Sequence, residues 1–237
     1  MTSLRLGDIA VDVVLKDIKN VHLSVYPPAG RVRISAPKRM SVDTIRVFAV
    51  SKLDWIKQQQ TKLREQDRES RREYLDRESH YVWGRRYLLK VLEADAAPDV
   101  QLRPGTMLLR VRPGAREEMR KAVVAGWYRQ ILKAAAQPLI DVWERRLRVG
   151  VQRLFVQQMR TKWGSCNTRA RSIRLNTELA KKPRECLEYV VLHELVHLIE
   201  RRHDERFRQY MDRFMPQWRQ YRDELNRAPL AHADWRY

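Results

Sequence analysis

The sequence is poor in the features that mark secreted, membrane-spanning and nucleotide-binding proteins. It has only two cysteines, Cys166 and Cys186, among 237 residues. Two cysteines form no disulfide framework and are typical of a reducing cytosol. Residues 1–14 lack the basic stretch and apolar run of a signal peptide. No stretch approaches the roughly 18 uninterrupted apolar residues that a membrane-spanning helix needs, and no P-loop, G-x-G-x-x-G motif or internal repeat is found. We therefore expect a cytoplasmic protein with no membrane partner.

Acidic residues are scarce relative to basic ones. The chain has 48 Lys and Arg against 29 Asp and Glu, a formal net charge of +19. Such an excess predicts attraction to polyanions, although a soluble basic surface without a partner would show it too. Residues 145–184 contain 12 basic residues and one acid, Glu178, so this segment alone carries +11. It keeps open an anionic, nucleotide-like substrate and a nucleic-acid partner bound through the basic surface.

The first half of the chain is rich in strand patterns. Residues 8–36 alternate polar and apolar side chains and predict a small antiparallel meander. Residues 42–70 have helical spacing after Ser41, a good N-cap residue, and residues 81–93 and 100–112 again look like strands. Because Pro113-Gly114 interrupts the pattern, we place a domain boundary there. Residues 1–112 would form a β-rich subdomain with one long helix, and residues 113–237 a second domain, in an α+β protein.

The second half is mainly helical. A long apolar stripe predicts a helix over residues 115–147. Residues 172–177 alternate as a half-buried strand, and Pro183 suits the first turn of the next helix, which we expect to stop near Arg202. A last helix is expected over residues 204–226, with a kink at Pro216.

The motif that organises these elements is His193-Glu194-Leu195-Val196-His197, followed by His203. Residues four apart share one face of a helix, so His193 and His197 can bind the same metal ion. Glu194 lies about 100° round the helix, where a general base for a metal-bound water belongs. With His203 as third ligand, the set matches a catalytic Zn²⁺ site that keeps its fourth position open.

The position of the third ligand follows from helix geometry. Glu200 falls on the same face as His193, but seven residues of helix rise about 10.5 Å. On a straight helix, Glu200 cannot bind the ion together with His193 and His197, and it suits a supporting or salt-bridge role better. His203 can be a ligand only if the helix ends between residues 198 and 203. The glycine that metzincins use for this turn is replaced by Glu200.

The residues around the motif resemble those of a known family. The resemblance is carried by Trp163-Gly164-Ser165-Cys166, Ile173-Arg174-Leu175-Asn176, Tyr189 to Leu198, His203, Phe207 and Met215-Pro216. In this order and spacing they are similar to the YgjP-like metallopeptidases, relatives of the WLM and SprT-like zincins. Asp204-Glu205 depart from the family's usual small residue and proline.

The resemblance implies a zincin-like catalytic domain: an active-site helix, backing helices and a short sheet whose edge strand faces the cleft. Our candidate for that edge strand is Ile173 to Thr177, to which an extended peptide could add by main-chain hydrogen bonds. Arg174 or Asn176 would then point toward substrate, or else face solvent. Trp163 and Tyr210 are further candidate substrate contacts.

These observations predict a zinc-dependent hydrolase, most simply a metallopeptidase. His193, His197 and His203 would hold Zn²⁺, and Glu194 would take a proton from the zinc-bound water. A metal-dependent nucleotide pyrophosphatase or phosphohydrolase, a nucleic-acid-associated protease and a nucleic-acid-binding module with structural zinc are the alternatives. Cys166 is a candidate metal ligand, cysteine-switch element or packing residue, and Cys186 is expected in the core.

Overall fold

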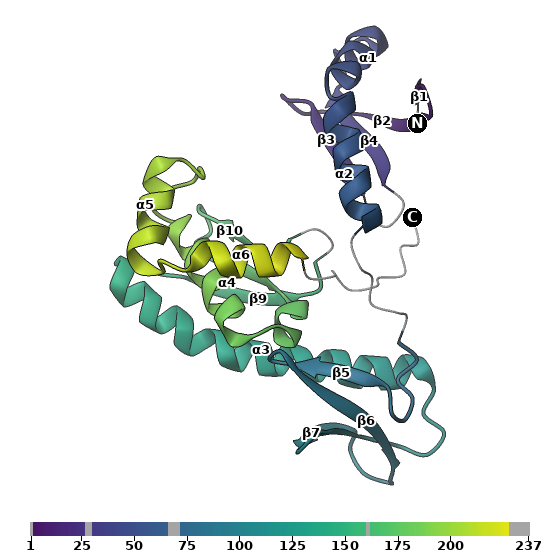
Figure 1. The fold of residues 1–237 in the computed structure, drawn as a ribbon, viewed down its shortest axis with the longest axis vertical. Helices are drawn as coiled ribbons and strands as arrows, with labels where there is room; N and C mark the ends of the chain where they lie inside the picture. The colour runs from purple at the N-terminus through teal and green to yellow at the C-terminus, as the bar shows by residue number, and fades with distance from the viewer. Residues whose placement is uncertain (1, 27–29, 66–71, 160–161, 228–237) are drawn as a thin grey trace. The chain divides into compact units, whose positions relative to one another are not determined.

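The computed structural model describes residues 2–26, 30–65, 72–159 and 162–227. The chain separates into two compact units, one up to residue 68 and one over residues 69–233. Mixed α and β structure is confirmed, with three sheets and six α-helices among the described residues (Figure 1). The units divide well before the boundary expected at residue 113. The reason is that the strands of residues 79–111 share their apolar core with the helices that follow them.

The first unit is a four-stranded sheet followed by two helices. Its elements are β1 (Thr2–Leu6), β2 (Ile9–Lys16), β3 (His22–Tyr26), β4 (Arg31–Pro37), α1 (Val42–Ser51) and α2 (Leu53–Glu65). The strand order is β1-β2-β4-β3, and β2 and β4 pair in parallel. The expected antiparallel meander is therefore wrong. Alternation of side chains identified the strands, but it carries no information on which strands become neighbours.

The single helix expected over residues 42–70 is interrupted. Ser41 caps α1 as expected, because its hydroxyl accepts a hydrogen bond from the backbone N–H of Thr44 at 3.2 Å. The helix ends at Ser51, and α2 begins at Leu53. Ile45, Ala49 and Ile56 are buried against the apolar face of the sheet. The end of the expected helix, residues 66–70, and the turn at Pro27 to Ala29 lie outside the described residues.

The second unit begins with a four-stranded sheet packed on a long helix (Figure 1). The elements are β5 (Ser79–Val82), β6 (Arg85–Glu93), β7 (Asp99–Arg103), β8 (Thr106–Val111) and α3 (Glu117–Leu147). The order is β5-β6-β8-β7, with β6 and β8 parallel. The hydroxyl of Tyr128 in α3 donates to the backbone oxygen of Tyr81 at 2.8 Å and ties the helix to β5.

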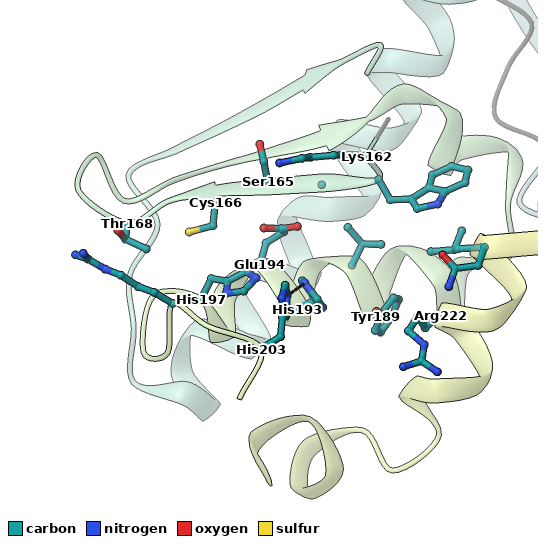
Figure 2. A pocket seen from close by; sticks show the side chains of 16 residues that line it. Lys162, Ser165, Cys166, Thr168, Tyr189, His193, Glu194, His197, His203 and Arg222 are labelled. Atoms are coloured by element: carbon teal, nitrogen blue, oxygen red, sulfur yellow. Dashed lines mark hydrogen bonds between the residues drawn. The ribbon is translucent and has the colours of Figure 1, made fainter. Parts of the chain in front are cut away.

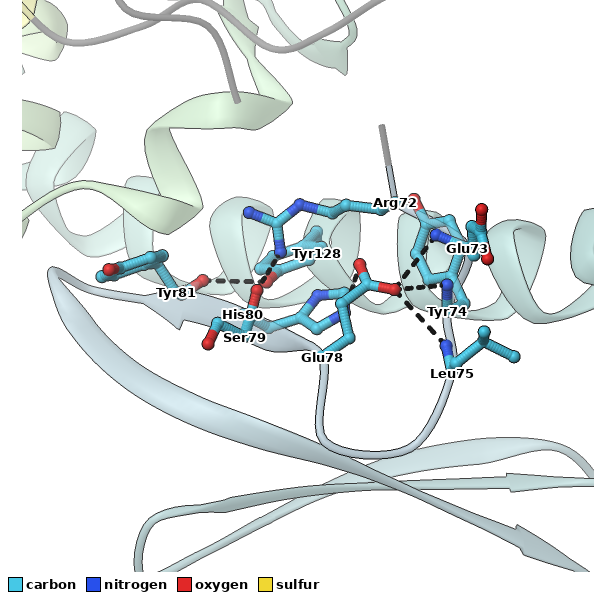
Figure 3. Close-up of polar contacts among 9 residues, drawn as sticks. All are labelled: Arg72, Glu73, Tyr74, Leu75, Glu78, Ser79, His80, Tyr81 and Tyr128. Carbon is cyan, nitrogen blue, oxygen red and sulfur yellow. Dashed lines mark hydrogen bonds and ion pairs between the residues drawn. The ribbon is translucent and has the colours of Figure 1, made fainter. Parts of the chain in front are cut away.

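The loop before β5 is closed by the carboxylate of Glu78 (Figure 3). One of its oxygens accepts hydrogen bonds from the backbone N–H groups of Glu73 at 3.0 Å and Tyr74 at 2.6 Å. The other oxygen lies 3.5 Å from Nε2 of the fully buried His80. These contacts anchor the first residues of this unit on its core.

A second, three-stranded sheet lies next to the motif helix. It consists of β9 (Arg153–Gln157), β10 (Gly164–Asn167) and β11 (Ser172–Asn176), in the order β10-β11-β9. The strand expected at residues 172–177 is confirmed, but its expected place at the edge is wrong. β11 is central, antiparallel to β10 and parallel to β9. The edge strand near the motif is β10. Its residues are typical of turns, so the sequence pattern did not predict a strand there.

The remaining elements are η1 (Thr177–Lys181), α4 (Arg184–Val196), α5 (Glu205–Phe214) and α6 (Trp218–Arg227). α4 ends six residues before the expected stop at Arg202, and the single helix expected over residues 204–226 is two helices separated at Pro216. Among the described residues, none of the helices has the length and apolar character to cross a membrane.

Candidate metal centre

The motif helix α4 is held in place by its apolar side chains. Val191, Leu192, Leu195 and Val196 are completely buried in the core of the second unit. This packing leaves His193 and His197 on the remaining face, so the helix presents both imidazoles at a fixed position and orientation.

The chain leaves the helix early enough for His203 to return to the same place. α4 ends at Val196, and Glu200 donates its backbone N–H to the Val196 oxygen at 2.8 Å in a tight turn. Asp204 then caps α5 by accepting a hydrogen bond from the backbone N–H of Phe207 at 3.1 Å. The aspartate that departs from the family pattern therefore starts the next helix and fixes the end of the loop that carries His203.

The three histidines converge on one point. Each offers one ring nitrogen, and these nitrogens lie within 4.8 Å of one another. Nε2 of His193 and Nε2 of His203 are 3.0 Å apart. Two ligands of a tetrahedral Zn²⁺ ion with bonds of about 2.1 Å lie about 3.4 Å apart, so a small adjustment would admit the ion. The side chain of Phe207 packs against all three rings, with centroid distances of 4.7 to 4.9 Å.

The surroundings of His193 and His197 favour the neutral form of these two imidazoles, which is the form that binds metal. Nδ1 of His197 lies 3.1 Å from the backbone oxygen of Glu200, which favours a proton on Nδ1 and leaves the Nε2 lone pair free. Burial, together with the two neighbouring histidines, lowers the pKa of His193 to about 3. Burial likewise lowers the pKa of His197. Neutral imidazoles with converging lone pairs are the donor set that Zn²⁺ takes.

Glu200 takes no part in the cluster through its side chain. The carboxylate lies 4.0 Å from the guanidinium of Arg206 and accepts a weak hydrogen bond from the backbone of Arg202. Its contribution is the backbone oxygen that holds His197. This agrees with the supporting role that the helix geometry predicted.

Glu194 lies beside the histidines beneath β10 (Figure 2). Its side chain is only 5% exposed, and burial raises its pKa to about 8, against a lowering effect of the Lys162 ammonium. Gly164 of β10 lies directly against it. A Cβ at position 164 would meet Glu194 Oε1 at 2.6 Å and Val190 Cγ1 at 2.8 Å. The glycine therefore lets the edge strand approach the carboxylate.

A pocket of about 720 Å³ opens over the histidines and Glu194. One wall is β10 with the residues before and after it, and the other is formed by α4, the His197–His203 loop and α6 (Figure 2). Its lining residues are Lys162, Trp163, Gly164, Ser165, Cys166, Thr168, Tyr189, Val190, His193, Glu194, His197, Arg201, His203, Arg222, Leu225 and Asn226.

Of the four substrate contacts predicted from the sequence, only Trp163 lines this pocket. Asn176 is completely buried and holds the backbone of residues 159 and 162, so the expectation that it faces substrate is wrong. The guanidinium of Arg174 lies over the ring of Phe155 at 5.2 Å. Tyr210 stacks on Phe214 with 6.4 Å between ring centroids.

Several lining residues were missed in the sequence. Lys162, Arg201 and Arg222 reach the pocket from three separate segments. The only sequence signals were the basic run that contains Lys162 and the position of Arg201 between two histidines of the motif. Tyr189 precedes His193 by one helical turn and packs its ring 5.7 Å from that imidazole.

The two cysteines are unpaired. Cys166 lines the pocket from β10 but is outside the cluster of three histidines. Burial, with a smaller effect of Glu194, raises its pKa to about 11. Cys186 is completely buried in the core, as expected. A thiol with a raised pKa is a poor nucleophile and a poor ligand at neutral pH.

Comparison with known proteins supplies a family. The model of the YgjP-like metallopeptidase domain matches residues 19–228. No curated protein sequence matches the chain. Two solved structures, both metallopeptidase zymogens, show a weak likeness. Jannalysin of Methanocaldococcus jannaschii has 17% identity and a TM-score of 0.35, over 38% of this chain and 87% of its own. Abylysin of Pyrococcus abyssi has 16% identity and a TM-score of 0.36, over 38% and 90%.

Proposed function

The chain belongs to the YgjP-like metallopeptidase family, and we propose that it hydrolyses peptide bonds with a Zn²⁺ ion held by His193, His197 and His203. The observation that carries the proposal is the convergence of three imidazole nitrogens within 4.8 Å beside a buried carboxylate. Three histidine ligands with a fourth position left open are typical of a catalytic zinc site. We further propose that α4, its backing helices and the sheet of β9 to β11 form a zincin-like arrangement.

The ion would polarise the scissile carbonyl, stabilise the charge that develops on its oxygen and acidify a water molecule next to it. The imidazoles supply the ligand positions, and Phe207 and the Glu200 backbone oxygen hold them in orientation. This support makes the geometry independent of substrate, as an efficient catalytic site requires.

Glu194 is the general base in this proposal. Its carboxylate would take a proton from the attacking water and deliver it to the amide nitrogen that leaves. Burial raises its pKa to about 8, which makes it a stronger base than an exposed glutamate. The Lys162 ammonium and the bound ion both favour the ionised form that accepts the proton.

The edge strand β10 would position the substrate. β10 pairs with β11 on one side, and its other side faces the pocket. An extended peptide can add to such an edge by main-chain hydrogen bonds, which hold the backbone irrespective of sequence. This binding mode would place a peptide carbonyl above the histidines and within reach of Glu194.

A nucleotide pyrophosphatase activity is the second candidate. It is favoured by the three basic side chains of the pocket, Lys162, Arg201 and Arg222, since such groups also bind phosphate. Hydrolysis of nucleoside triphosphates without any cleavage of peptides would support it and contradict the peptidase proposal.

The test is a comparison of Glu194→Gln with the wild type in metal content and in hydrolysis of a mixed peptide library. Gln has the size of Glu but is no base, so we expect Zn²⁺ to be retained and peptide cleavage to fall by at least about 100-fold. His193→Ala should lose the metal. Glu185→Gln, at an exposed glutamate of the same helix, is the matched control and should retain both. Normal turnover by Glu194→Gln would contradict the mechanism.

A further inference from the structure

We infer that this pocket selects peptides that carry acidic side chains on both sides of the scissile bond, and that Lys162, Arg201 and Arg222 recognise them. The inference rests on the proposed peptidase function and adds a substrate class to it. Its basis is the uneven distribution of charge around the histidine cluster.

Among the described residues, the lining of the pocket has three basic side chains and a single acidic one. The acid is Glu194, which is 5% exposed and lies beneath β10. Lys162, Arg201 and Arg222 are all exposed. A substrate entering the pocket therefore meets positive charge first, and a groove lined with one sign of charge attracts the opposite sign.

Arg201 is left without an acidic partner because its neighbours are engaged elsewhere. Glu200 interacts with Arg206 and with the backbone of residue 202. Asp204 caps α5, and Glu205 forms an ion pair with Arg208 at 2.9 Å. Within the described part of this unit, Arg201 and its neighbour Arg202 are thus both without an acidic partner, and of these two Arg201 lines the pocket.

Lys162 acts on the buried carboxylate of Glu194 but has no exposed acidic partner among the described residues. It precedes β10 by two residues, and the structure records no hydrogen bond or ion pair of its ammonium with any described residue. Figure 2 shows its side chain extending along β10 toward the space above Glu194. A carboxylate of a bound substrate would be the first exposed acid within its reach.

Arg222 is held in a defined position on α6. Its guanidinium lies 5.1 Å from the ring centroid of Trp218 and 2.9 Å from the carboxylate of Asp223. Since Asp223 is itself exposed, this pair offsets only part of the charge. We therefore expect Arg222 to contribute less to recognition than Lys162 and Arg201.

Two of the basic groups, Arg222 and Arg201, come from opposite ends of the groove, and Lys162 lies along β10 between them. Along α4, Tyr189 is on the side of Arg222, and His197, which precedes the loop of Arg201, is on the side of Thr168 (Figure 2). The eight residues from Tyr189 to His197 rise about 12 Å. Side chains on one face of an extended peptide repeat every ~6.6 Å. Two carboxylates separated by one or two such repeats fit this spacing better than the contiguous phosphates of a nucleotide.

The first experiment compares two peptides on the zinc-loaded wild type. One has Asp and Glu on both sides of its cleavage site, and the other has Asn and Gln at the same positions. We expect kcat/KM to be about 10-fold higher for the acidic peptide at about 0.05 M salt, and the ratio to shrink at about 0.5 M as screening shortens the range of attraction. A ratio of one or less at low salt would overturn the inference.

The second experiment assigns the preference to residues. Lys162→Gln and Arg201→Gln should each lower the acidic-to-amide ratio several-fold, up to about fivefold for one exposed ion pair. Arg153→Gln is the matched control, because Arg153 is an exposed arginine on β9, at the far edge of the same sheet. It removes the same charge and should leave the ratio unchanged. An equal fall of the ratio in Arg153→Gln would show a general charge effect and contradict local recognition.

A binding measurement separates this inference from the proposed function. Fluorescein-labelled forms of both peptides are titrated with zinc-loaded Glu194→Gln protein and followed by anisotropy. If the acidic peptide binds tighter but the wild type cleaves neither, the peptidase proposal fails and the recognition surface stands. If the wild type cleaves both peptides equally and both bind equally, the inferred recognition of acidic side chains is contradicted and the proposed peptidase function is supported. ATP that displaces the acidic peptide at far lower concentration than the unlabelled peptide does would overturn the peptide assignment.

Discussion

Gly164→Ala should damage the site more than the addition of one methyl group suggests. The added Cβ would lie 2.6 Å from Glu194 Oε1 and 2.8 Å from Val190 Cγ1. Carbon atoms in good contact are about 3.5–4.0 Å apart, so about 1 Å of movement is required. Val190 is 3% exposed and packed in the core, which leaves displacement of β10 or of the Glu194 carboxylate. Gly164 does not have a positive φ, so the effect is one of space alone.

The expected losses of stability and of catalytic rate follow from that displacement. Overpacking of this kind costs about 1–3 kcal/mol. At about 2–4 °C per kcal/mol for a unit of this length, Tm should fall by about 2–12 °C. A misplacement of about 1 Å at a catalytic group costs about 100-fold in rate. We therefore expect peptide hydrolysis to fall about 100-fold at temperatures where the variant is still folded.

The assay measures kcat/KM and thermal unfolding of Gly164→Ala beside Gly126→Ala. Gly126 lies inside α3, and a Cβ there has no heavy atom within 4 Å. The free energy of unfolding of this control should rise by up to about 1 kcal/mol, because alanine has a higher helix propensity than glycine. Its activity should equal that of the wild type. Wild-type activity and Tm in Gly164→Ala would refute the close approach of β10 to Glu194.

Three other perturbations test the surroundings of the site. Asn176→Ala removes hydrogen bonds to the backbone of residues 159 and 162, just before β10, and should lower the free energy of unfolding by about 1–3 kcal/mol. Denaturant titration measures this value, and an unchanged free energy would contradict the anchoring role of Asn176. Asp204→Ala removes the cap of α5 and should lower the free energy of unfolding by about 1 kcal/mol. Because Asp204 also fixes the end of the loop that carries His203, zinc affinity in a competition assay should be weaker. Unchanged affinity and stability would argue against this role of Asp204. Burial raises the thiol pKa of Cys166 from 9.0 to about 11 and that of Cys186 to about 12. The reactive thiolate is therefore depleted below these values, and alkylation at pH 8 should be at least about 100-fold slower in folded than in urea-unfolded protein; equal rates would show that the thiols are not shielded.

The convergence of the three histidines could be predicted from the sequence because it depends on local geometry. The spacing of His193 and His197 fixes their common helix face. Ligation by His203 then required the helix to end between residues 198 and 203, and α4 ends slightly earlier, at Val196. The exclusion of Glu200 as a ligand came from the same helical rise. Each of these inferences uses the regular dimensions of one element and its nearest turn.

The failed predictions of strand pairing and of substrate contacts concern relations between distant segments. Residues 172–176 form a strand as expected, but the sheet places β10 and β9 on its two sides, so Asn176 is buried rather than facing the pocket. β10 itself has only four residues, Gly164–Asn167, and a strand pattern that short gives no periodicity to detect. In the first unit, the expected meander was wrong because alternation of side chains does not reveal that β2 pairs in parallel with β4.

The sequence by itself determined the features on which the proposed chemistry rests: the histidines that converge, the glutamate beside them and the helix that presents them. Those features follow from spacing along a single regular element, which the order of residues fixes. Only the tertiary structure decided which strand borders the pocket, which glycine lets that strand approach Glu194, and which of the described basic side chains line the pocket. Strand pairing and pocket lining depend on the packing of segments far apart in the chain, and local periodicity carries no record of that packing.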